Sequence, residues 1–553
     1  MTIDPTVTTA DLILARTGDD HPGLLFEDRV WSWGEFVSEC ILRACWLLEH
    51  KDPGRPFHVG VLLENEPEYL FLIGGAALAG AAVVGVNLTR RGAELAGDIR
   101  FTDCQILVTS RSLRPLLTGL DVGTDLVVTH DDAGYAAALE RHRGRPAPDV
   151  PQAHDPRQVL LLLFTSGSTG APKAVICSTG RFSAIAQYQH MGLGREDVTY
   201  NSMPLFHGNA LMAAWANPLF TGGTYAMARK FSASGFLDDI RAFKATYFNY
   251  VGRSLAYILA QPERPQERQT SLRCAFGTEA SRRDRAEFER RFGVAPTESY
   301  GSSEGALTLL KTPDSPPESL GMPAPGVRAA VLDPVTMRDC PPARFDENGL
   351  LLNPDEAIGE LANRTGAAAF EGYYNNPAAE AERVRGAIFM TGDLAYRDER
   401  GYFYFAGRGT DRLRVDSENF AAAPIERILS RFPGVGLVAV YPVPDERTGD
   451  QAMAAIQVAD MAAFDIGAFA RFLGEQPDLG TKWAPRYLRL VTDVPVTATR
   501  KIDKPALRRQ RWEVDDVVYY RPGAELAYRV LDAADRTRIR RDFAANQRRN
   551  YLT

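Results

Sequence analysis

The sequence is poor in cysteine and histidine, and neither residue type forms a recognisable pattern. Its six cysteines stand at positions 40, 45, 104, 177, 274 and 340, without a C-x-x-C pair or a metal-ligand spacing. The eight histidines form no ligand pair. These absences argue against a disulfide scaffold and against a histidine–cysteine metal centre. They are typical of reduced, mostly structural thiols in a cytoplasmic protein.

Excess charge and targeting signals are also scarce. The net charge is only −7, which argues against general nucleic-acid binding. The first twenty residues lack a basic start followed by an apolar core, so no secretory signal is expected. One uncharged run, residues 69–86, reaches the lower length limit of a membrane span but consists largely of Ala and Gly. We expect a buried helix, a break near Gly80 and a buried strand there, and no transmembrane segment.

The sequence has the composition and length of a globular protein with more than one domain. Of its 553 residues, 45% are hydrophobic and 24% are charged. Short apolar segments alternate with helix-length stretches, and they lie at 58–63, 81–86, 105–109 and 125–130. This alternation predicts an α/β fold with a largely parallel sheet.

The second half of the chain changes character twice. From about Gly321, short alternating runs rich in Gly, Pro and Val predict a β-rich subdomain, and beyond Arg408 about 145 residues remain for a small α+β domain. We therefore predict a large N-terminal domain at 1–408 and a small mobile C-terminal domain at 409–553. The arginine-rich end, residues 536–549, predicts a basic helix with a solvated face; a membrane surface or an acidic partner is the alternative.

The most informative stretch is LLLLFTSGSTGAPKAVI at residues 160–176. Five apolar residues predict a buried strand, which runs into a loop crowded with hydroxyls and glycines. Such a loop suits a polyphosphate, because glycines let backbone N–H groups approach oxyanions while hydroxyls and Lys173 add further donors. It is not a Walker A loop, since Pro172 precedes the lysine and Ala174 follows it. We expect the loop to lead into another extended segment.

This string closely resembles the nucleotide-binding signature of the adenylate-forming superfamily, which includes acyl-CoA synthetases, adenylation domains of peptide synthetases and luciferases. Further strings resemble other parts of that pattern in the same order. They are FGTEA at 276–280, YGSSEG at 300–305, TGD at 391–393, AGR at 406–408 and PVTATRKIDKPALR at 495–508. The resemblance implies ATP and magnesium as cofactors, with CoA as the co-substrate.

The resemblance also implies the nucleotide contacts. Tyr300 would stack on adenine, while Asp393 and Arg408 would hold the ribose, because a carboxylate can accept hydrogen bonds from both hydroxyls of a diol. Glu304 and Thr165 would hold magnesium. The implied cofactor-binding set is Thr165, Ser166, Gly167, Ser168, Thr169, Gly170, Lys173, Gly277, Thr278, Glu279, Tyr300, Gly301, Ser302, Ser303, Asp393 and Arg408.

The last string would supply the catalytic lysine of the small domain. That lysine would be Lys501, with Lys504 as the second candidate. When a carboxylate attacks the α-phosphorus, negative charge gathers on oxygens that an ammonium group can stabilise. The implied catalytic set is Lys501, Glu304 and His207. His207 would gate the acyl site, with a hydrogen-bonded structural histidine as the alternative.

Within the superfamily, PLFHGNA, YFNYVGRSLAYILA and the ENF…IER stretch resemble the fatty acid transport protein and medium- or long-chain acyl-CoA ligase branch. The implied reaction forms an acyl adenylate and pyrophosphate from a carboxylic acid and ATP, and CoA then takes the acyl group. The strings that contain the expected pocket residues have few charged side chains, so we expect the substrate to be an apolar or aromatic acid. The expected pocket residues are Phe206, Trp215, Tyr250, Val251, Gly252, Ala306 and Leu307.

Ser417 leaves open which molecule accepts the activated group. The resemblance implies that the loop around Val415 to Phe420, which contains Ser417, faces the thiol of CoA. Relatives carry glycine in this loop, where the backbone comes close to the pantetheine arm of CoA, so thioester formation is less secure than adenylation. The first alternative is an ATP-dependent diazotase, which would activate nitrite and pass it to an aromatic amine. The second is an enzyme that loads a carrier protein, and the third is an inactive scaffold. The oligomeric state is also open, with a homodimer among the options.

Overall fold

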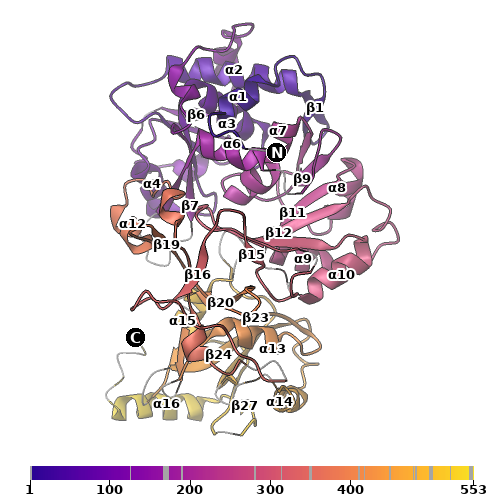
Figure 1. The fold of residues 1–553 in the computed structure, drawn as a ribbon, viewed down its shortest axis with the longest axis vertical. Helices are drawn as coiled ribbons and strands as arrows, with labels where there is room; N and C mark the ends of the chain where they lie inside the picture. Colours follow the sequence, from indigo (N-terminus) through magenta and orange to yellow (C-terminus); the bar gives the residue numbers. More distant parts are fainter. Residues whose placement is uncertain are drawn as a thin grey trace. The chain divides into compact units, whose positions relative to one another are not determined.

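The computed structural model describes the chain in two compact units. The first unit comprises residues 1–306 and 368–382, and the second comprises 307–367 and 383–553. Figure 1 shows the elements of each unit. The described residues are 3–124, 126–165, 173–188, 191–278, 280, 282–312, 314–347, 351–408, 412–415, 418–446, 450–477, 479, 483–496, 502–523, 525–546, 548 and 552.

The first sheet of the first unit is parallel apart from its last strand. Its order is β6(Val127–Thr129), β5(Ile106–Thr109), β3(His58–Leu62), β4(Ala82–Gly85), β7(Val159–Thr165) and β8(Lys173–Ser178). The neighbours from β6 to β7 pair in parallel, whereas β8 pairs with β7 in the antiparallel direction. The predicted α/β fold with a largely parallel sheet is confirmed.

The uncharged run at 69–86 forms a helix and a strand, as expected. Helix α3(Pro67–Ala79) ends at Gly80, whose positive φ of 67° closes the helix, and β4 follows immediately. Both elements are buried within the first unit. Among the described residues, no helix combines the length and apolar character needed to cross a membrane.

The second sheet of the first unit is also mainly parallel. Its order is β13(Pro296–Tyr300), β12(Cys274–Thr278), β11(Tyr247–Val251), β9(Val198–Asn201), β10(Thr224–Met227), β1(Pro22–Phe26) and β2(Arg29–Ser32). The hairpin β1–β2 forms one end, and β1 pairs with β10 in parallel. Parallel strands place their carboxyl ends at one edge, which is where open α/β sheets bind ligands. Residues that follow β11, β12 and β13 therefore meet there.

Helices cover both sheets of the first unit. Figure 1 shows α8(Phe236–Ala242), α9(Gly252–Leu259) and α10(Arg282–Phe292) beside β11 and β12, with which they share a hydrophobic cluster. Helix α2(Trp33–Glu49) begins with a capping box formed by Ser32 and Glu35. The other helices of this unit are α1(Thr9–Leu14), α4(Gly92–Phe101), η1(Arg114–Leu117), α5(Ala133–Glu140), η2(Pro151–His154), α6(Thr179–Gln187), the π-helix η3(Asn209–Trp215) and α7(Ala216–Thr221).

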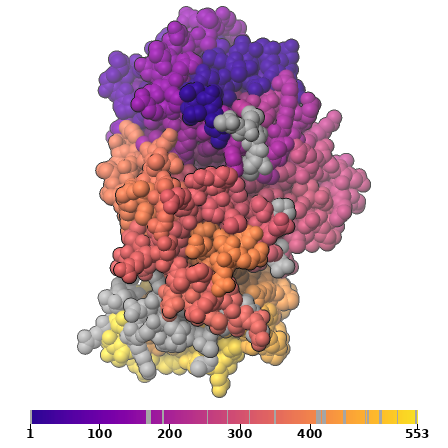
Figure 2. All heavy atoms as spheres, viewed as in Figure 1, coloured from indigo at the N-terminus to yellow at the C-terminus, as the bar shows by residue number. Residues whose placement is uncertain are grey.

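Residues 368–382 return to the first unit from far along the chain. Tyr373 forms an antiparallel bridge with Val175 of β8, and the backbone N–H of Ile176 donates to the carbonyl of Gly372 at 3.1 Å. In Figure 2 the upper orange atoms, in the region of α12(Pro377–Arg383), lie against the purple atoms of the first unit. This attachment extends the first sheet beyond β8.

The second unit is rich in β-structure, as predicted for the region after Gly321. It contains the antiparallel pair β14(Leu309–Leu310) and β15(Met322–Pro323), and a sheet with the order β16-β17-β19-β18 in which β20 pairs with β19. The bounds are β16(Ala329–Leu332), β17(Gly359–Asn363), β18(Val384–Arg385), β19(Ile388–Arg397) and β20(Phe403–Arg408), with α11(Pro354–Ala357) and η4(Gly366–Ala368) between strands.

The C-terminal part of the second unit is an α+β arrangement. Its strands are the pair β21(Arg412–Val415) and β22(Glu418–Ala421) and a sheet of β23(Val435–Pro444), β24(Asp450–Val458), β25(Tyr487–Val491), β26(Val518–Tyr520) and β27(Arg529–Val530). Its helices are α13(Ala422–Leu429), α14(Ile466–Gly474), α15(Lys504–Gln510) and α16(Ala533–Ala545), seen near this sheet in Figure 1. The predicted boundary at 408/409 and the mobility of 409–553 stay predictions.

The basic C-terminal segment forms α16, which packs one face inward. Ile539 and Phe543 are buried in a cluster with the sheet. Arg538 pairs with the buried Asp535 at 2.7 Å, and the exposed Arg540 pairs with Glu513. Because acidic neighbours neutralise part of the arginine charge, the helix fits a solvated face better than a free basic surface.

Candidate active site

The phosphate loop connects two paired strands. Strand β7 ends at Thr165 and β8 begins at Lys173, and these two residues are register partners in the antiparallel pair. The expectation that the loop leads into a second extended segment is confirmed. The predicted Ser166, Gly167, Ser168, Thr169 and Gly170 lie outside the described residues, as does the side chain of Thr165.

Lys173 is buried and already has an acidic partner. Its Nζ lies 3.1 Å from Oε2 of Glu382 and 5.9 Å from the ring centroid of Tyr373. The lysine side chain is 7% exposed, whereas that of Glu382 is 58% exposed. An ammonium group so far from water needs a nearby negative charge. Glu382 provides one here, and an incoming phosphate would provide another.

Glu304 lies just beyond the end of β13 and is held by Tyr373. The Tyr373 hydroxyl donates to Oε1 of Glu304 at 2.8 Å. The chain between Tyr300 and Glu304 is fixed in addition by Arg181, whose guanidinium donates to the carbonyl of Ser303. Gly305 follows with a φ of +67°, and a Cβ there would meet that guanidinium at 2.3 Å. Of the YGSSEG string, Gly301 and Ser302 are exposed, and Tyr300, Ser303 and Glu304 are half-buried.

The FGTEA string lies at the end of β12 against Tyr250. Gly277 and Tyr250 are register partners on neighbouring strands, and a Cβ on Gly277 would meet the Tyr250 carbonyl oxygen at 2.4 Å. Only glycine allows this close approach. Thr278 ends the strand, and Glu279 lies outside the described residues. The structure therefore brings one predicted cofactor residue and one predicted substrate residue into direct contact.

Glu298 is a residue that the sequence did not single out. Its Oε1 accepts a hydrogen bond from the backbone N–H of Ala280 at 2.7 Å and from the Tyr250 hydroxyl at 3.4 Å. Arg285 lies 3.3 Å from its Oε2. Burial raises the pKa of Tyr250, and the negative charge of Glu298 raises it further, so the phenol stays protonated and donates. Glu298 thus ties Tyr250 to the loop after β12.

A Gly277→Ala substitution is expected to lower both stability and substrate affinity. The added methyl group would overlap the Tyr250 backbone, and such overpacking costs about 1–3 kcal/mol. We expect a lower Tm and a higher KM for the acid, measured by calorimetry and steady-state kinetics. Gly97→Ala, inside α4 with nothing within 4 Å of its Cβ, is the control: it should leave the KM unchanged and should not lower Tm, because alanine is the better helix former. Parent-like values for Gly277→Ala would refute the close packing.

The remaining predicted pocket residues lie on three segments of the chain. Phe206 and His207 precede η3, with ring centroids 4.2 Å apart, and the Cβ of an alanine at Gly85 would touch the backbone of Phe206. Trp215 ends η3 and is 1% exposed, with its ring 5.6 Å from that of Phe182. Val251 ends β11, Gly252 begins α9, and Ala306 and Leu307 are buried. Whether these residues line an acyl pocket, and whether His207 acts as a gate, stay predictions.

The two predicted ribose-binding residues are neighbours in the second unit. Asp393 on β19 and Arg408 on β20 are register partners in an antiparallel pair. The Asp393 N–H donates to Oγ1 of Thr391 at 3.1 Å, and the Gly392 N–H donates to the Glu360 carboxylate at 2.7 Å. Burial raises the pKa of Glu360. The side chain of Arg408 lies outside the described residues, so only its strand position supports the prediction.

The two candidate lysines near the C-terminus differ in what the structure describes. Lys501 lies outside the described residues, as does Ser417 of the proposed thiol-facing loop. Lys504 begins α15, and its Nζ lies 2.7 Å from Oε1 of Glu426. The same oxygen accepts the backbone N–H of Val440 at 2.7 Å. Lys504 is therefore paired with Glu426 within the second unit. The assignment of the catalytic role to Lys501 stays a prediction.

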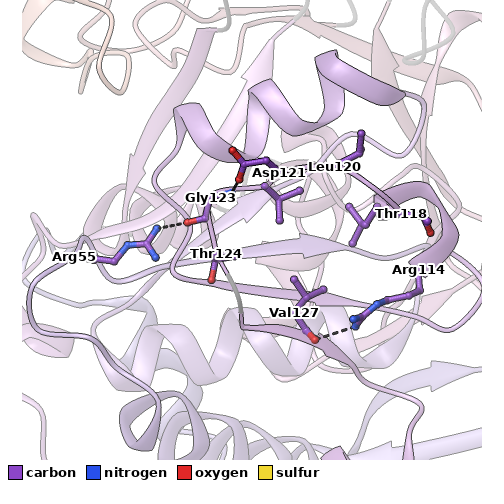
Figure 3. A pocket seen from close by; sticks show the side chains of 10 residues that line it. Arg55, Arg114, Thr118, Leu120, Asp121, Gly123, Thr124 and Val127 are labelled. Carbon is purple, nitrogen blue, oxygen red and sulfur yellow. Dashed lines mark hydrogen bonds between the residues drawn. The ribbon is translucent and has the colours of Figure 1, made fainter.

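A separate cavity of about 710 Å³ lies beside β6, away from the predicted residues. Figure 3 shows its two arginines directed at main-chain carbonyls: Arg55 donates to Gly123 and Arg114 donates to Val127, each at 2.9 Å. These contacts fix the loop between β5 and β6. None of the predicted site residues lines this cavity. In the described ranges, no cluster of three or more His, Cys, Asp and Glu residues could hold a metal ion.

Comparisons with known proteins identify the family. The family model described as "AMP-binding enzyme" matches residues 13–374, and the chain belongs to this family. It is 48% identical to the steroid-22-oyl-CoA synthetase of Rhodococcus jostii (strain RHA1), covering 99% of each chain. It is 42% identical to the medium/long-chain-fatty-acid–CoA ligase FadD17 of Mycobacterium marinum, covering 94% of this chain and 99% of the relative.

Solved structures agree on the fold. ATP-bound MatB from Rhodopseudomonas palustris superposes with a TM-score of 0.79 at 24% identity, covering 91% of this chain and 99% of MatB. The anthranilate CoA ligase AuaEII, solved in complex with anthranoyl-AMP, gives a TM-score of 0.79 at 21% identity and covers 92% of this chain. At these identities the likeness shows the fold alone. It agrees with the predicted fold class of parallel α/β sheets, a β-rich subdomain and a small α+β part.

Proposed function

We propose that the enzyme activates a bulky apolar carboxylic acid with ATP and transfers the acyl group to CoA. The steroid acids are the class that we favour, and medium- and long-chain fatty acids are the second candidate. The observation that carries the proposal is the 48% identity with a steroid-22-oyl-CoA synthetase, which covers 99% of both chains. Relatives at 42% identity are named as medium/long-chain-fatty-acid–CoA ligases, and this similarity supports fatty acids as the second candidate. The activity common to these relatives is that of an acid–thiol ligase. The chain is an ATP-dependent acid–thiol ligase.

The proposed reaction has two steps, adenylation of the acid and transfer of the acyl group to CoA. A carboxylate oxygen attacks the α-phosphorus of ATP, the bond between the α-phosphorus and the bridging oxygen breaks, and pyrophosphate leaves. The CoA thiolate then attacks the acyl carbon, and AMP leaves. Lys173 would bind the phosphates by exchanging Glu382 for a phosphate oxygen, and Lys501 would stabilise charge at the α-phosphate in the first step.

The residues present fit a magnesium ion on the phosphate side. Glu304 is half-buried and accepts its hydrogen bond from a neutral phenol, so this contact leaves the negative charge of the carboxylate in place. Carboxylate oxygens are preferred ligands of Mg²⁺. Glu304 would hold the ion together with Thr165, and the bound ion would offset negative charge on the phosphate oxygens.

The proposal extends to Asp393, Arg408 and the small domain. Asp393 and Arg408 occupy neighbouring positions on β19 and β20, and this supports their joint recognition of the ribose hydroxyls. Residues 409–553 would rotate between the two steps, so that Lys501 serves the first and the loop around Ser417 serves the second. We also propose a cytoplasmic location, and a homodimer is an assembly to test by light scattering.

Pyrophosphate release from MgATP tests the substrate class and the acceptor together. The panel contains a steroid acid with a side-chain carboxylate, decanoate, hexadecanoate and malonate, each with and without CoA, and nitrite with aromatic amines. We expect CoA-dependent turnover, with kcat/KM for the steroid acid at least about tenfold above that for the fatty acids, because additional buried apolar contacts discriminate on this scale. Malonate is the matched polar control.

Each other outcome has a defined meaning. A preference for hexadecanoate would replace the steroid class by the fatty class while the ligase activity stands. Nitrite-dependent turnover with an amine and without CoA would replace the ligase by a diazotase. Acyl adenylate that accumulates with CoA present, and that is transferred only to a carrier protein, would identify the carrier protein as the acceptor.

A further inference from the structure

Tyr373 contacts both Glu304 and Lys173, the two charged side chains that we expect around the nucleotide phosphates. Its hydroxyl donates to Oε1 of Glu304 at 2.8 Å, and its ring centroid lies 5.9 Å from Nζ of Lys173. The side chain is only 2% exposed. Glu304 and Lys173 precede Tyr373 by 69 and 200 positions in the sequence, so tertiary packing brings the three residues together.

The backbone of Tyr373 is fixed from both sides. It forms an antiparallel bridge with Val175, and the next residue, Tyr374, donates its N–H to the carbonyl of Ala174 at 2.9 Å. The Tyr373 N–H itself donates to Oε1 of Glu380 at 2.8 Å. Gly372 precedes it with a φ of +99°, a conformation that favours glycine. These contacts attach the segment to β8, directly after the phosphate loop.

The ring of Tyr373 is also held by packing. It lies in a hydrophobic cluster with Val175 and Ala379, and Phe370 contacts it edge-on with ring centroids 5.0 Å apart. A ring fixed in this way has little freedom to move its hydroxyl. The hydrogen bond to Glu304 therefore selects one orientation of the carboxylate, and it does so without adding a positive charge that would compete with a metal ion.

We propose that Tyr373 is a positioning residue that orients the Glu304 carboxylate for the metal ion of the metal–nucleotide complex. The inference rests on the proposed role of Glu304 as a magnesium ligand. Hydrogen bonds that orient a metal-ligating carboxylate raise metal affinity, and their loss costs about 10–100-fold in affinity or activity. Tyr373 acts through Glu304 and makes no contact with the reacting atoms in this assignment.

Tyr373→Phe removes the hydroxyl and keeps the ring, so it tests the hydrogen bond. We expect the Mg²⁺ concentration for half-maximal acyl-adenylate formation to rise about tenfold. Mn²⁺ affinity, measured by electron paramagnetic resonance with the non-reactive analogue α,β-methylene-ATP, should fall by a similar factor. The KM for the acid should stay within about twofold, since the hydroxyl is directed at Glu304 and not at the predicted pocket residues.

Tyr374→Phe is the matched control on the adjacent residue. The Tyr374 hydroxyl also donates to a carboxylate at 2.8 Å, but the acceptor is Oδ2 of Asp103, which the site does not include. Burial raises the pKa of Tyr374 to about 12, so its hydroxyl stays protonated and donates this hydrogen bond. The control should change Tm by a similar amount and leave the Mg²⁺ dependence unchanged.

Glu304→Gln separates failure of this inference from failure of the underlying metal role. If Glu304→Gln shifts the Mg²⁺ dependence and Tyr373→Phe does not, the positioning role is overturned while Glu304 remains a metal ligand. If neither variant shifts it, the metal role fails as well. If Tyr373→Phe and Glu304→Gln both act through the Glu304 carboxylate, the double variant should shift the Mg²⁺ dependence no more than Glu304→Gln alone. Additive shifts would overturn the inference.

Discussion

Lys501→Ala should abolish most acyl-adenylate formation while leaving thioester formation from preformed acyl adenylate nearly intact. The ammonium group is expected to stabilise charge that develops at the α-phosphate, and loss of such a group costs about 100–1,000-fold in rate. ATP–pyrophosphate exchange measures the first step alone. Transfer from synthetic acyl adenylate to CoA measures the second, in which the α-phosphate is no longer attacked.

Lys504→Ala is the control for charge in the same segment. Lys504 pairs with Glu426 inside the second unit, so its removal should lower Tm and leave exchange within about threefold of the wild type. Exchange at the wild-type rate in Lys501→Ala would exclude this lysine from the first step. Loss of exchange in Lys504→Ala alone would transfer the catalytic assignment to Lys504 and show that the Glu426 pair opens during turnover.

Glu304→Gln is expected to lower adenylation by about 100-fold at limiting Mg²⁺, and excess Mg²⁺ should restore part of the rate. The amide keeps a carbonyl acceptor for the Tyr373 hydroxyl but removes the negative charge that a divalent cation requires. Initial rates of pyrophosphate release over a range of Mg²⁺ concentrations, at fixed ATP and acid, measure the effect.

Glu298→Gln provides the comparison, because Glu298 lies on β13 just before the same string. Its contacts go to Ala280, Tyr250 and Arg285, so the substitution should raise the KM for the acid and leave the Mg²⁺ dependence unchanged. A Mg²⁺ dependence that is altered equally in both variants would mean that the Glu304 effect reflects general disturbance of β13. It would then remove the evidence for a metal ligand.

The elements that the sequence predicted well are those specified by neighbouring residues. The alternating apolar segments of the first sheet, the helix–strand break at Gly80 and the strand–loop–strand order around Lys173 all follow from local pattern. Asp393 and Arg408 were predicted from the strings that contain them, and the structure shows that they are register partners on paired strands; their role at the ribose stays a prediction. Lys501 and the loop residues 166–170 lie outside the described residues, so their roles stay predictions from the motifs.

The sequence alone therefore determined the family, the types of element and most of the residues expected around the nucleotide. Only the tertiary structure decided that residues 368–382 join the first unit, that Tyr373 holds Glu304, that Glu382 pairs with Lys173 and that Glu298 connects Tyr250 to the loop after β12. The physical reason is that periodicity and turn chemistry act over a few residues, whereas these contacts join segments up to 209 residues apart. Such pairs form because packing brings β8, β13 and the returning segment together, and no local pattern in any one of them specifies its partner.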